Sequence, residues 1–169
     1  MADVKKACME SLKVVPLGRT PAEIQNGTDF YKYLFGHHPD LRKYFKGAES
    51  FTPDDVQKSD RFAKQGTALL MTVHIFANTY DNYCVKNKIN ISRFEDMVFR
   101  SLCRDLMDRH VGRNVDPSLW KGFWGIWTAF LESKGASLSG DQKAAWEKLG
   151  ATFNEECQQH LAKLGLPHT

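Results

Sequence analysis

One histidine stands where apolar packing alone would favour another residue. His110 lies in the stretch "DLMDRHVGRNVDP", four residues after Leu106 and on the same face of a helical pattern. A histidine ring can bind a metal ion through one nitrogen or exchange a proton near neutral pH. Taken alone, such a histidine is more often a structural residue than a ligand. A functional interpretation of His110 therefore needs support from other parts of the chain.

The other candidates for metal or catalytic chemistry are weaker. His37 and His38 are adjacent, so on a helix they would point about 100° apart and would not share one metal ion easily. Cys103 lies seven residues before His110, but a structural zinc site needs two more ligands at compatible spacing, and the sequence offers none. His74 is best explained as a core or surface histidine. The sequence also lacks a Gly-rich phosphate loop, a Gly-x-Ser-x-Gly elbow and a His-Glu-x-x-His pair.

Two glycines inside helical patterns supply a second signal. Gly27 and Gly66 each lie well inside a predicted helix, although glycine costs a helix about 1 kcal/mol relative to alanine. A close crossing of the two helices at these glycines would explain their presence. Tyr31 lies one turn after Gly27, and Gln65 directly precedes Gly66. The crossing would therefore bring a tyrosine hydroxyl and a glutamine amide side by side.

Helix-start signals define the elements that must position these residues. "TPAE" at 20–23, "TPDD" at 52–55, "SRFE" at 92–95 and "SGDQ" at 139–142 each combine a capping residue with a partner three residues later, and "DPS" at 116–118 offers an aspartate cap. Between these signals the apolar residues recur with a period near 3.6, and no convincing alternating strand is present. The sequence predicts a short turn at 39–44 and helices at 3–16, 20–36, 52–57, 59–80, 92–111, 116–134 and 139–164.

The predicted fold class is all-α, in a single domain over residues 1–169. One connection is unusually long: residues 81–91, "DNYCVKNKINI", are polar and β-branched. We expect this segment to be a surface excursion between two long helices rather than part of a pocket.

Composition excludes several classes of function. Lys and Arg number 23 and Asp and Glu 20, a net charge of +3, and the basic residues are scattered, which gives no footprint for nucleic acid or an anionic membrane. No run of about 18 apolar residues predicts a membrane span. The start of the chain lacks the apolar segment of a secretory signal, so we expect a cytoplasmic protein. Its four cysteines are then expected to be buried thiols: Cys8, Cys84, Cys103 and Cys157.

Taken together, these features resemble a globin, and most closely a nematode globin. The resemblance runs from the first long helix to the last, through "FYKYLF", "PDLRKYFKGAE", "RFAKQG", "DRH", "DPSLW", "FLESKG" and "QKAAWEKLG". Its specific parts are the pairing of Tyr31 with Gln65 and a corner phenylalanine, Phe45, six residues after Pro39. The resemblance implies a globin fold of about eight helices around a pocket for haem b.

The resemblance also implies a role for each site residue. His110 would be the proximal histidine, the sole protein ligand to the haem iron. Its second ring nitrogen should then donate a hydrogen bond to a backbone carbonyl of its own helix, that of Leu106. Tyr31 and Gln65 would be the distal pair that donates hydrogen bonds to bound O₂.

The remaining pocket positions are apolar. Phe45 would pack against the porphyrin, Leu69 would contact the distal side, and Leu106 would lie on the proximal side. Ala68 stands where a basic residue would be useful for a haem propionate. This leaves weaker candidates for that role: Arg61, Lys64 and Arg113.

The function that the resemblance implies is reversible, high-affinity binding of O₂ for storage, scavenging or transport, with CO and NO as further ligands. A haem redox enzyme, such as a nitric-oxide dioxygenase or a peroxidase, is the first alternative. It would need an external electron donor, because the chain has no room for a reductase domain. A haem-based gas sensor is the second, although no output domain is visible. The sequence leaves both a monomer and a homodimer open.

Overall fold

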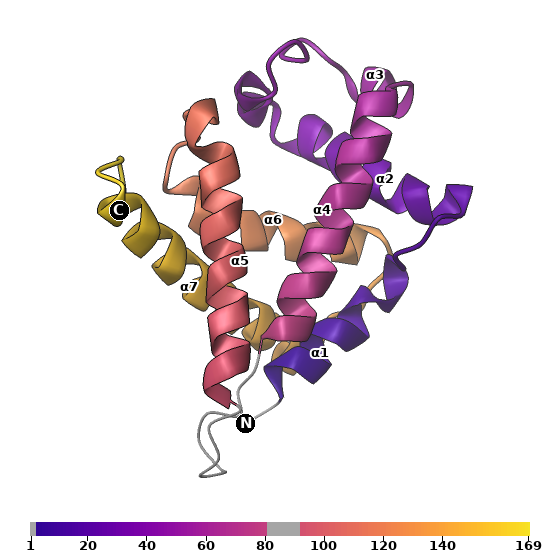
Figure 1. Ribbon diagram of the computed structural model, residues 1–169. Helices are drawn as coiled ribbons and strands as arrows, with labels where there is room; N and C mark the ends of the chain where they lie inside the picture. The colour runs from indigo at the N-terminus through magenta and orange to yellow at the C-terminus, as the bar shows by residue number, and fades with distance from the viewer. Residues whose placement is uncertain (1–2, 81–91) are drawn as a thin grey trace. The chain divides into compact units, whose positions relative to one another are not determined.

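The computed structural model describes residues 3–80 and 92–169, apart from the side chains of residues 92–96 (Figure 1). Within these ranges every regular element is an α-helix or a 3₁₀-helix, which confirms the all-α prediction. The chain divides into two compact units: Leu12–His74, and Met1–Ser11 together with Ile75–Thr169. We call them the tyrosine unit and the histidine unit, because they contain Tyr31 and His110 respectively. The predicted excursion at 81–91, with Cys84, lies outside the described residues.

The tyrosine unit is built around α2, against which α3 and the 3₁₀-helix η2 pack (Figure 1). Helix α4 belongs to this unit as far as His74 and continues beyond it. The elements of the unit are η1 (Leu12–Val14), α2 (Pro21–His37), η2 (Pro39–Tyr44), α3 (Pro53–Gln57) and α4 (Asp60–Thr79).

Capping boxes start three of the helices, as the sequence predicted. The hydroxyl of Thr20 accepts a hydrogen bond from the Glu23 amide at 3.3 Å, and the Glu23 carboxylate accepts one from the Thr20 amide at 2.9 Å. Thr52 and Asp55 repeat this exchange at α3, and "SGDQ" repeats it at the start of α7 (Gly140–Lys163). Each box satisfies two amides that a helix N-terminus otherwise leaves without partners. The predicted box at 92–95 involves side chains outside the described set.

The predicted crossing of two helices at glycine is confirmed. A Cβ atom added to Gly27 of α2 would lie 2.6 Å from the Gly66 carbonyl oxygen and 2.7 Å from the Thr67 nitrogen. A Cβ atom added to Gly66 of α4 would lie 2.7 Å from the Gly27 Cα. The two backbones therefore touch, and no side chain fits between them.

A methyl group at this crossing is expected to destabilise the protein. Gly66→Ala should lower the free energy of unfolding by roughly 1–3 kcal/mol, because the new Cβ meets backbone that yields only if the helices move apart. Urea unfolding measures the change. Gly122→Ala is the matched control: an added Cβ there meets nothing within 4 Å, so the gain in helix propensity should stabilise the protein by about 1 kcal/mol. Equal effects of the two substitutions would show that the crossing does not constrain the fold.

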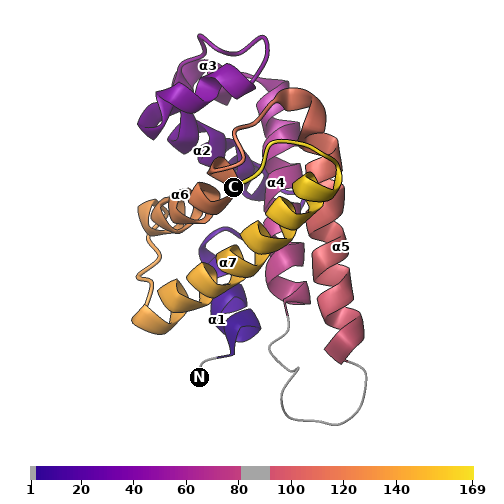
Figure 2. The ribbon, with the colours of Figure 1, turned by 90° about the vertical axis from the view of Figure 1, so that its left-hand side faces the viewer.

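The histidine unit is organised by its C-terminal helix. Helix α7 packs against α1, α5 and α6 (Figure 1), and Figure 2 shows how the chain turns back from the end of α6 into the start of α7. The elements of this unit are α1 (Val4–Ser11), the end of α4, α5 (Ser92–His110), η4 (Val111–Arg113), α6 (Leu119–Ser133) and α7.

Aromatic rings fill the core of the histidine unit. The Phe76 ring lies 5.4 Å from Phe99 and 5.3 Å from Phe153, both edge-on. The rings of Trp124 and Trp146 stack at 5.6 Å, and the Trp146 indole N–H donates a hydrogen bond to the Ser11 hydroxyl at 2.9 Å. Such rings contribute a large apolar area and prefer these edge-on or offset arrangements. The core thereby fixes the framework on which α5 and His110 lie.

One predicted helix end and one predicted helix start were wrong. The first α-helix ends at Ser11, not at residue 16, and gives way to η1. The Ser11 hydroxyl donates to the Cys8 carbonyl at 2.7 Å, and Pro16 disfavours a helical Val15, so the α-helix does not continue.

The aspartate cap predicted at 116–118 was also wrong. Helix α6 begins at Leu119, and its cap residue, Ser118, makes no side-chain capping bond. The Asp116 carboxylate instead accepts from the amide and the hydroxyl of Ser118, at 2.9 and 2.7 Å. An aspartate that bonds two residues ahead forms a turn of its own, which delays the helix start.

Candidate functional site

Tyr31 is held among phenylalanine rings in the tyrosine unit. Its side chain is 5% exposed, and its ring lies 5.6 Å from Phe45 and 5.2 Å from Phe62. Phe35, fully buried, lies 5.1 Å from each of these two rings. The tyrosine ring therefore has little freedom to turn, and its hydroxyl is carried in a fixed direction.

The corner residue Phe45 is supported by an arginine. Its amide donates to the Arg42 carbonyl at 2.8 Å. The Arg42 guanidinium in turn donates from Nε to the Phe35 carbonyl at 3.1 Å, and it lies 5.8 Å from the Phe35 ring. Arg42 thus ties η2 to the end of α2, where carbonyls lack helical partners. Phe45 itself is only half-buried, so part of its ring surface remains available to another group.

Gln65 and Leu69 lie one turn apart on α4, and both are half-buried. Gln65 directly precedes Gly66, and Tyr31 lies one turn beyond Gly27 on α2. The glycine crossing therefore places Gln65 and Tyr31 within about one turn of the same contact point. That their polar groups lie side by side stays a prediction.

Two of the basic candidates, Arg61 and Lys64, lie three residues apart on α4. Arg61 donates from Nη1 to the Lys46 carbonyl at 2.8 Å, and its guanidinium lies 5.5 Å from the Phe62 ring. It therefore holds the chain that follows the Phe45 corner. Lys64 and Ala68 are exposed on α4, and Arg113 is exposed in the histidine unit.

His110 is the last residue of α5, and one hydrogen bond determines which of its ring nitrogens carries the hydrogen. Its Nδ1 lies 2.7 Å from the Leu106 carbonyl oxygen, which confirms the expected bond. Because a carbonyl only accepts, Nδ1 carries the hydrogen, and Nε2 of the neutral ring keeps its lone pair. Burial lowers the pKa of His110; the Leu106 bond opposes this shift, and the charges of Arg113 and Arg109 add to it. The lowered pKa favours the neutral form of the ring.

A tryptophan that the sequence analysis did not single out contacts His110. The Trp120 ring lies 5.2 Å from the imidazole with an interplanar angle of 85°, an edge-on contact. Trp120 is half-buried and lies at the start of α6, just beyond the turn at Asp116. A large aromatic residue at the first helical turn after the His110 loop was the available signal.

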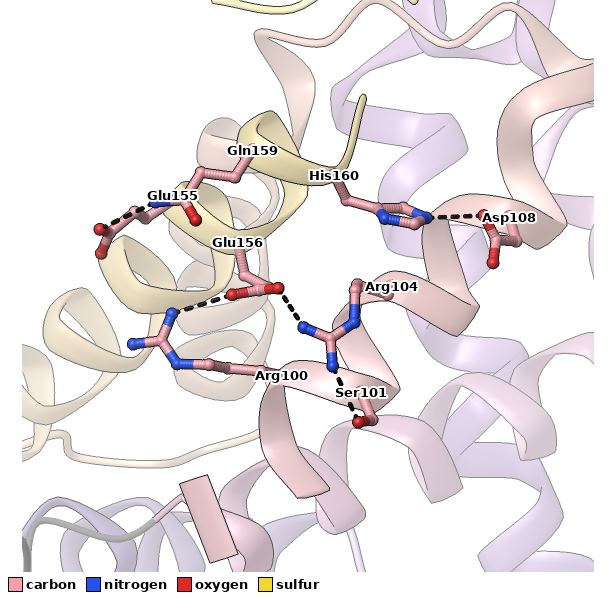
Figure 3. Close-up of polar contacts among 8 residues, drawn as sticks. All are labelled: Arg100, Ser101, Arg104, Asp108, Glu155, Glu156, Gln159 and His160. Carbon is pink, nitrogen blue, oxygen red and sulfur yellow. Dashed lines mark hydrogen bonds and ion pairs between the residues drawn. The ribbon is translucent and has the colours of Figure 1, made fainter. Parts of the chain in front are cut away.

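Salt bridges join α5, the helix that ends at His110, to α7 (Figure 3). Glu156 of α7 is only 3% exposed, and its carboxylate accepts from Arg100 at 2.9 Å and from Arg104. Farther along the same two helices, the His160 Nε2 lies 2.7 Å from Asp108. Burial alone would raise the pKa of Glu156, but the hydrogen bonds and charges of the two arginines bring it below its ordinary value. Glu156 was not among the residues predicted to be important, although this acidic residue interrupts an apolar face of α7.

Loss of the Glu156 charge should destabilise the protein in a pH-dependent way. Glu156→Gln is expected to lower the free energy of unfolding at pH 7 by about 1–2 kcal/mol, because two charged hydrogen bonds are weakened while the arginines stay partly hydrated. The pKa of Glu156 is lowered in the folded state, so its contribution is complete above the ordinary pKa of 4.5 and is lost as pH falls through the lower folded value. The difference between wild type and variant should therefore shrink in acid.

Unfolding curves at several pH values test this. Glu155→Gln makes the same substitution one residue earlier, at an exposed side chain that accepts from Gln159 at 3.2 Å (Figure 3). It should change stability little at any pH. A Glu156→Gln deficit that persists unchanged below pH 4 would contradict the assigned pKa direction.

The other histidine and cysteine candidates in the described chain have structural surroundings. The His74 Nε2 lies 3.2 Å from the Val15 carbonyl, and burial lowers its pKa, which supports its interpretation as a core histidine. Cys8, Cys103 and Cys157 are free, buried thiols, as predicted. Burial raises the pKa of all three, that of Cys8 to about 12, so they are unreactive at neutral pH.

The described helices include one that ends at a half-buried histidine and another with a buried tyrosine beside a glycine crossing, and comparison with known proteins defines the family of this helical protein. Residues 28–157 match the globin family model. The chain is 61% identical to a myoglobin of Nippostrongylus brasiliensis, with 99% of both proteins covered. It is 58% identical to the cuticular globin isoform of the same organism, over 99% of this chain and 88% of that protein.

A solved structure supports the same assignment. The globin-like protein of Caenorhabditis elegans superposes with a TM-score of 0.87 at 42% identity, over 98% of this chain and 96% of that one. The chain belongs to the globin family, its fold is the globin fold, and binding of haem iron follows from that membership. No helix in the described part of the chain is long and apolar enough to cross a membrane.

Proposed function

We propose that this globin binds O₂ reversibly and with high affinity at haem b, with Nε2 of His110 as the only protein ligand to the iron. The observation that carries the proposal is the 2.7 Å bond from Nδ1 to the Leu106 carbonyl, which leaves Nε2 of a neutral ring as a metal ligand. The similarity to a nematode myoglobin supports a respiratory-gas ligand. CO and NO are expected to compete for the same position.

Apolar side chains complete the proposed haem surroundings. Phe45 would pack on the porphyrin with the exposed part of its ring, and Leu69 and Leu106 would exclude water on the distal and proximal sides. All three are half-buried, so each has surface to offer a ligand. Their part in the proposal is packing and exclusion of water, with no polar contact.

The distal donors account for the proposed high affinity. Ferrous haem held by His110 would supply reversible binding of O₂, and the bound O₂ would carry partial negative charge. The Tyr31 hydroxyl and the Gln65 amide would each donate a hydrogen bond to it. A hydrogen bond to a charged partner contributes about 1.5–3 kcal/mol, and 1.4 kcal/mol is tenfold in affinity. Such slow release suits storage or scavenging better than rapid delivery.

We also propose a single globin domain in a reducing, cytoplasmic compartment. The family match at 28–157 includes parts of both units, which supports one domain. The three free thiols favour a reducing environment. Light scattering of the purified protein distinguishes a monomer from a homodimer.

Absorption spectra of the purified protein test the central proposal. We expect one haem per chain, a five-coordinate deoxy form, and full, reversible conversion on exposure to O₂ or CO. A deoxy spectrum of a six-coordinate haem would contradict the open ligand position. Rapid NO consumption with many turnovers and a simple reductant would favour the redox enzyme instead.

A further inference from the structure

The bond between His110 and Leu106 leaves one movement of the imidazole weakly restrained. Hydrogen bonds at a carbonyl oxygen tolerate a broad range of directions, and rotation about the Cβ–Cγ bond of histidine has broad energy wells. The Nδ1 contact therefore fixes the tautomer of the ring more firmly than its rotation. A second contact is needed to fix the plane of the ring.

Trp120 provides that contact. Its ring meets the imidazole edge-on at 5.2 Å and 85°, the geometry that aromatic pairs prefer. Rotation of the imidazole about Cβ–Cγ would drive one of its edges into the indole or open a gap beside it. Either change loses packing, so the tryptophan selects one rotational angle.

The backbone that carries Trp120 is anchored independently of α5. The Trp120 amide donates to the Pro117 carbonyl at 3.4 Å, and the same carbonyl accepts from Nε2 of Gln158 in α7 at 2.9 Å. Gln158 is 7% exposed, and its Nε2 also donates to Asn154 at 3.0 Å. The start of α6 is thereby fixed to α7, and the indole forms a firm wall beside His110.

We propose that Trp120 is a positioning residue that sets the rotational angle of the His110 imidazole, and hence the direction of its π system relative to the haem. This inference rests on the proposed function for the role of His110 as the iron ligand. In low-spin ferric haem the orientation of the imidazole plane determines how unpaired electron density is distributed over the porphyrin. The chemical shifts of the haem methyl groups therefore report this angle directly.

The test compares variants of the haem-loaded protein by proton NMR of the ferric cyanide form. Trp120→Leu removes the ring and should change the spread or the order of the methyl shifts. Trp120→Phe retains an aromatic edge and should restore a pattern close to wild type. Phe123→Leu, which deletes another aromatic residue of α6 packed on Trp124 and Trp127, should leave the pattern unchanged. Resonance Raman spectra of the ferrous form should show a broader or shifted iron–histidine band in Trp120→Leu alone.

The outcomes separate this inference from the proposed function. A wild-type protein without an iron–histidine band would overturn the proposed function. A wild-type band together with native methyl shifts and a native band in Trp120→Leu would overturn only the role of Trp120. If Trp120→Leu does not retain haem, Trp120→Met, which keeps bulk without a ring, is judged by the same two spectra.

Discussion

Replacing His110 with alanine is expected to produce a purified protein that does not hold stoichiometric haem. The substitution removes the proposed protein–iron bond, and leaves only packing contacts to retain the haem. The Leu106 carbonyl also loses the Nδ1 donor that lies 2.7 Å away. The ratio of haem absorbance to protein absorbance after gel filtration measures retention.

The matched control replaces His74, another partly buried histidine. His74→Ala loses the 3.2 Å contact with the Val15 carbonyl and the packing of a half-buried ring, but no proposed iron ligand, so it should retain haem at the wild-type ratio. In His110→Gly, added imidazole should restore the five-coordinate spectrum, because it can occupy the vacated position. A His110→Ala protein with stoichiometric haem and an unchanged spectrum would show that another group ligates the iron.

The second large effect is expected from Tyr31→Phe, which deletes one hydroxyl and keeps the ring. The ring contacts with Phe45 and Phe62 remain, so packing should barely change. The proposed hydrogen bond to bound O₂ is lost, at about 1.5–3 kcal/mol. The O₂ dissociation rate should therefore rise at least about tenfold, with a smaller effect on association, since the donor acts after the ligand has arrived.

Stopped-flow displacement of O₂ measures this rate. CO carries less negative charge when bound, so its dissociation should respond much less to the same substitution. Tyr33→Phe makes an identical change on α2, at a ring stacked on His37 at 4.1 Å, and should leave both rates unaltered. An unchanged O₂ dissociation rate in Tyr31→Phe would mean that Tyr31 serves only as a core aromatic.

Features that depend on short stretches of chain could be predicted from the sequence. The capping boxes at Thr20 and Thr52 depend on two side chains three residues apart, and both form as expected. The crossing at Gly27 and Gly66 was predictable because a mid-helix glycine is unfavourable without a close neighbour. The bond from His110 to Leu106, four residues earlier on the same helix, was implied by the resemblance to globins and is present.

Features that depend on distant partners could not be predicted in this way. Glu156 interrupts an apolar face of α7, but its partners are two arginines of α5 that lie more than fifty residues earlier in the chain. The role of Trp120 depends on its ring contact with His110, across the turn at Asp116 that precedes the start of α6 at Leu119. In both cases the role of the residue depends on a contact with another helix, which the local sequence does not contain.

The glycine crossing also limits how this protein can evolve. Because the backbones at Gly27 and Gly66 touch, each position tolerates a side chain only if the other helix has already moved away. A lineage that acquired alanine at one position would gain little from a later change at the other, since the damage is done by the first methyl group. Selection therefore acts against the first replacement at either position. Drift in α2 and α4 is expected to spare both positions while the residues on the outer faces of these helices diversify.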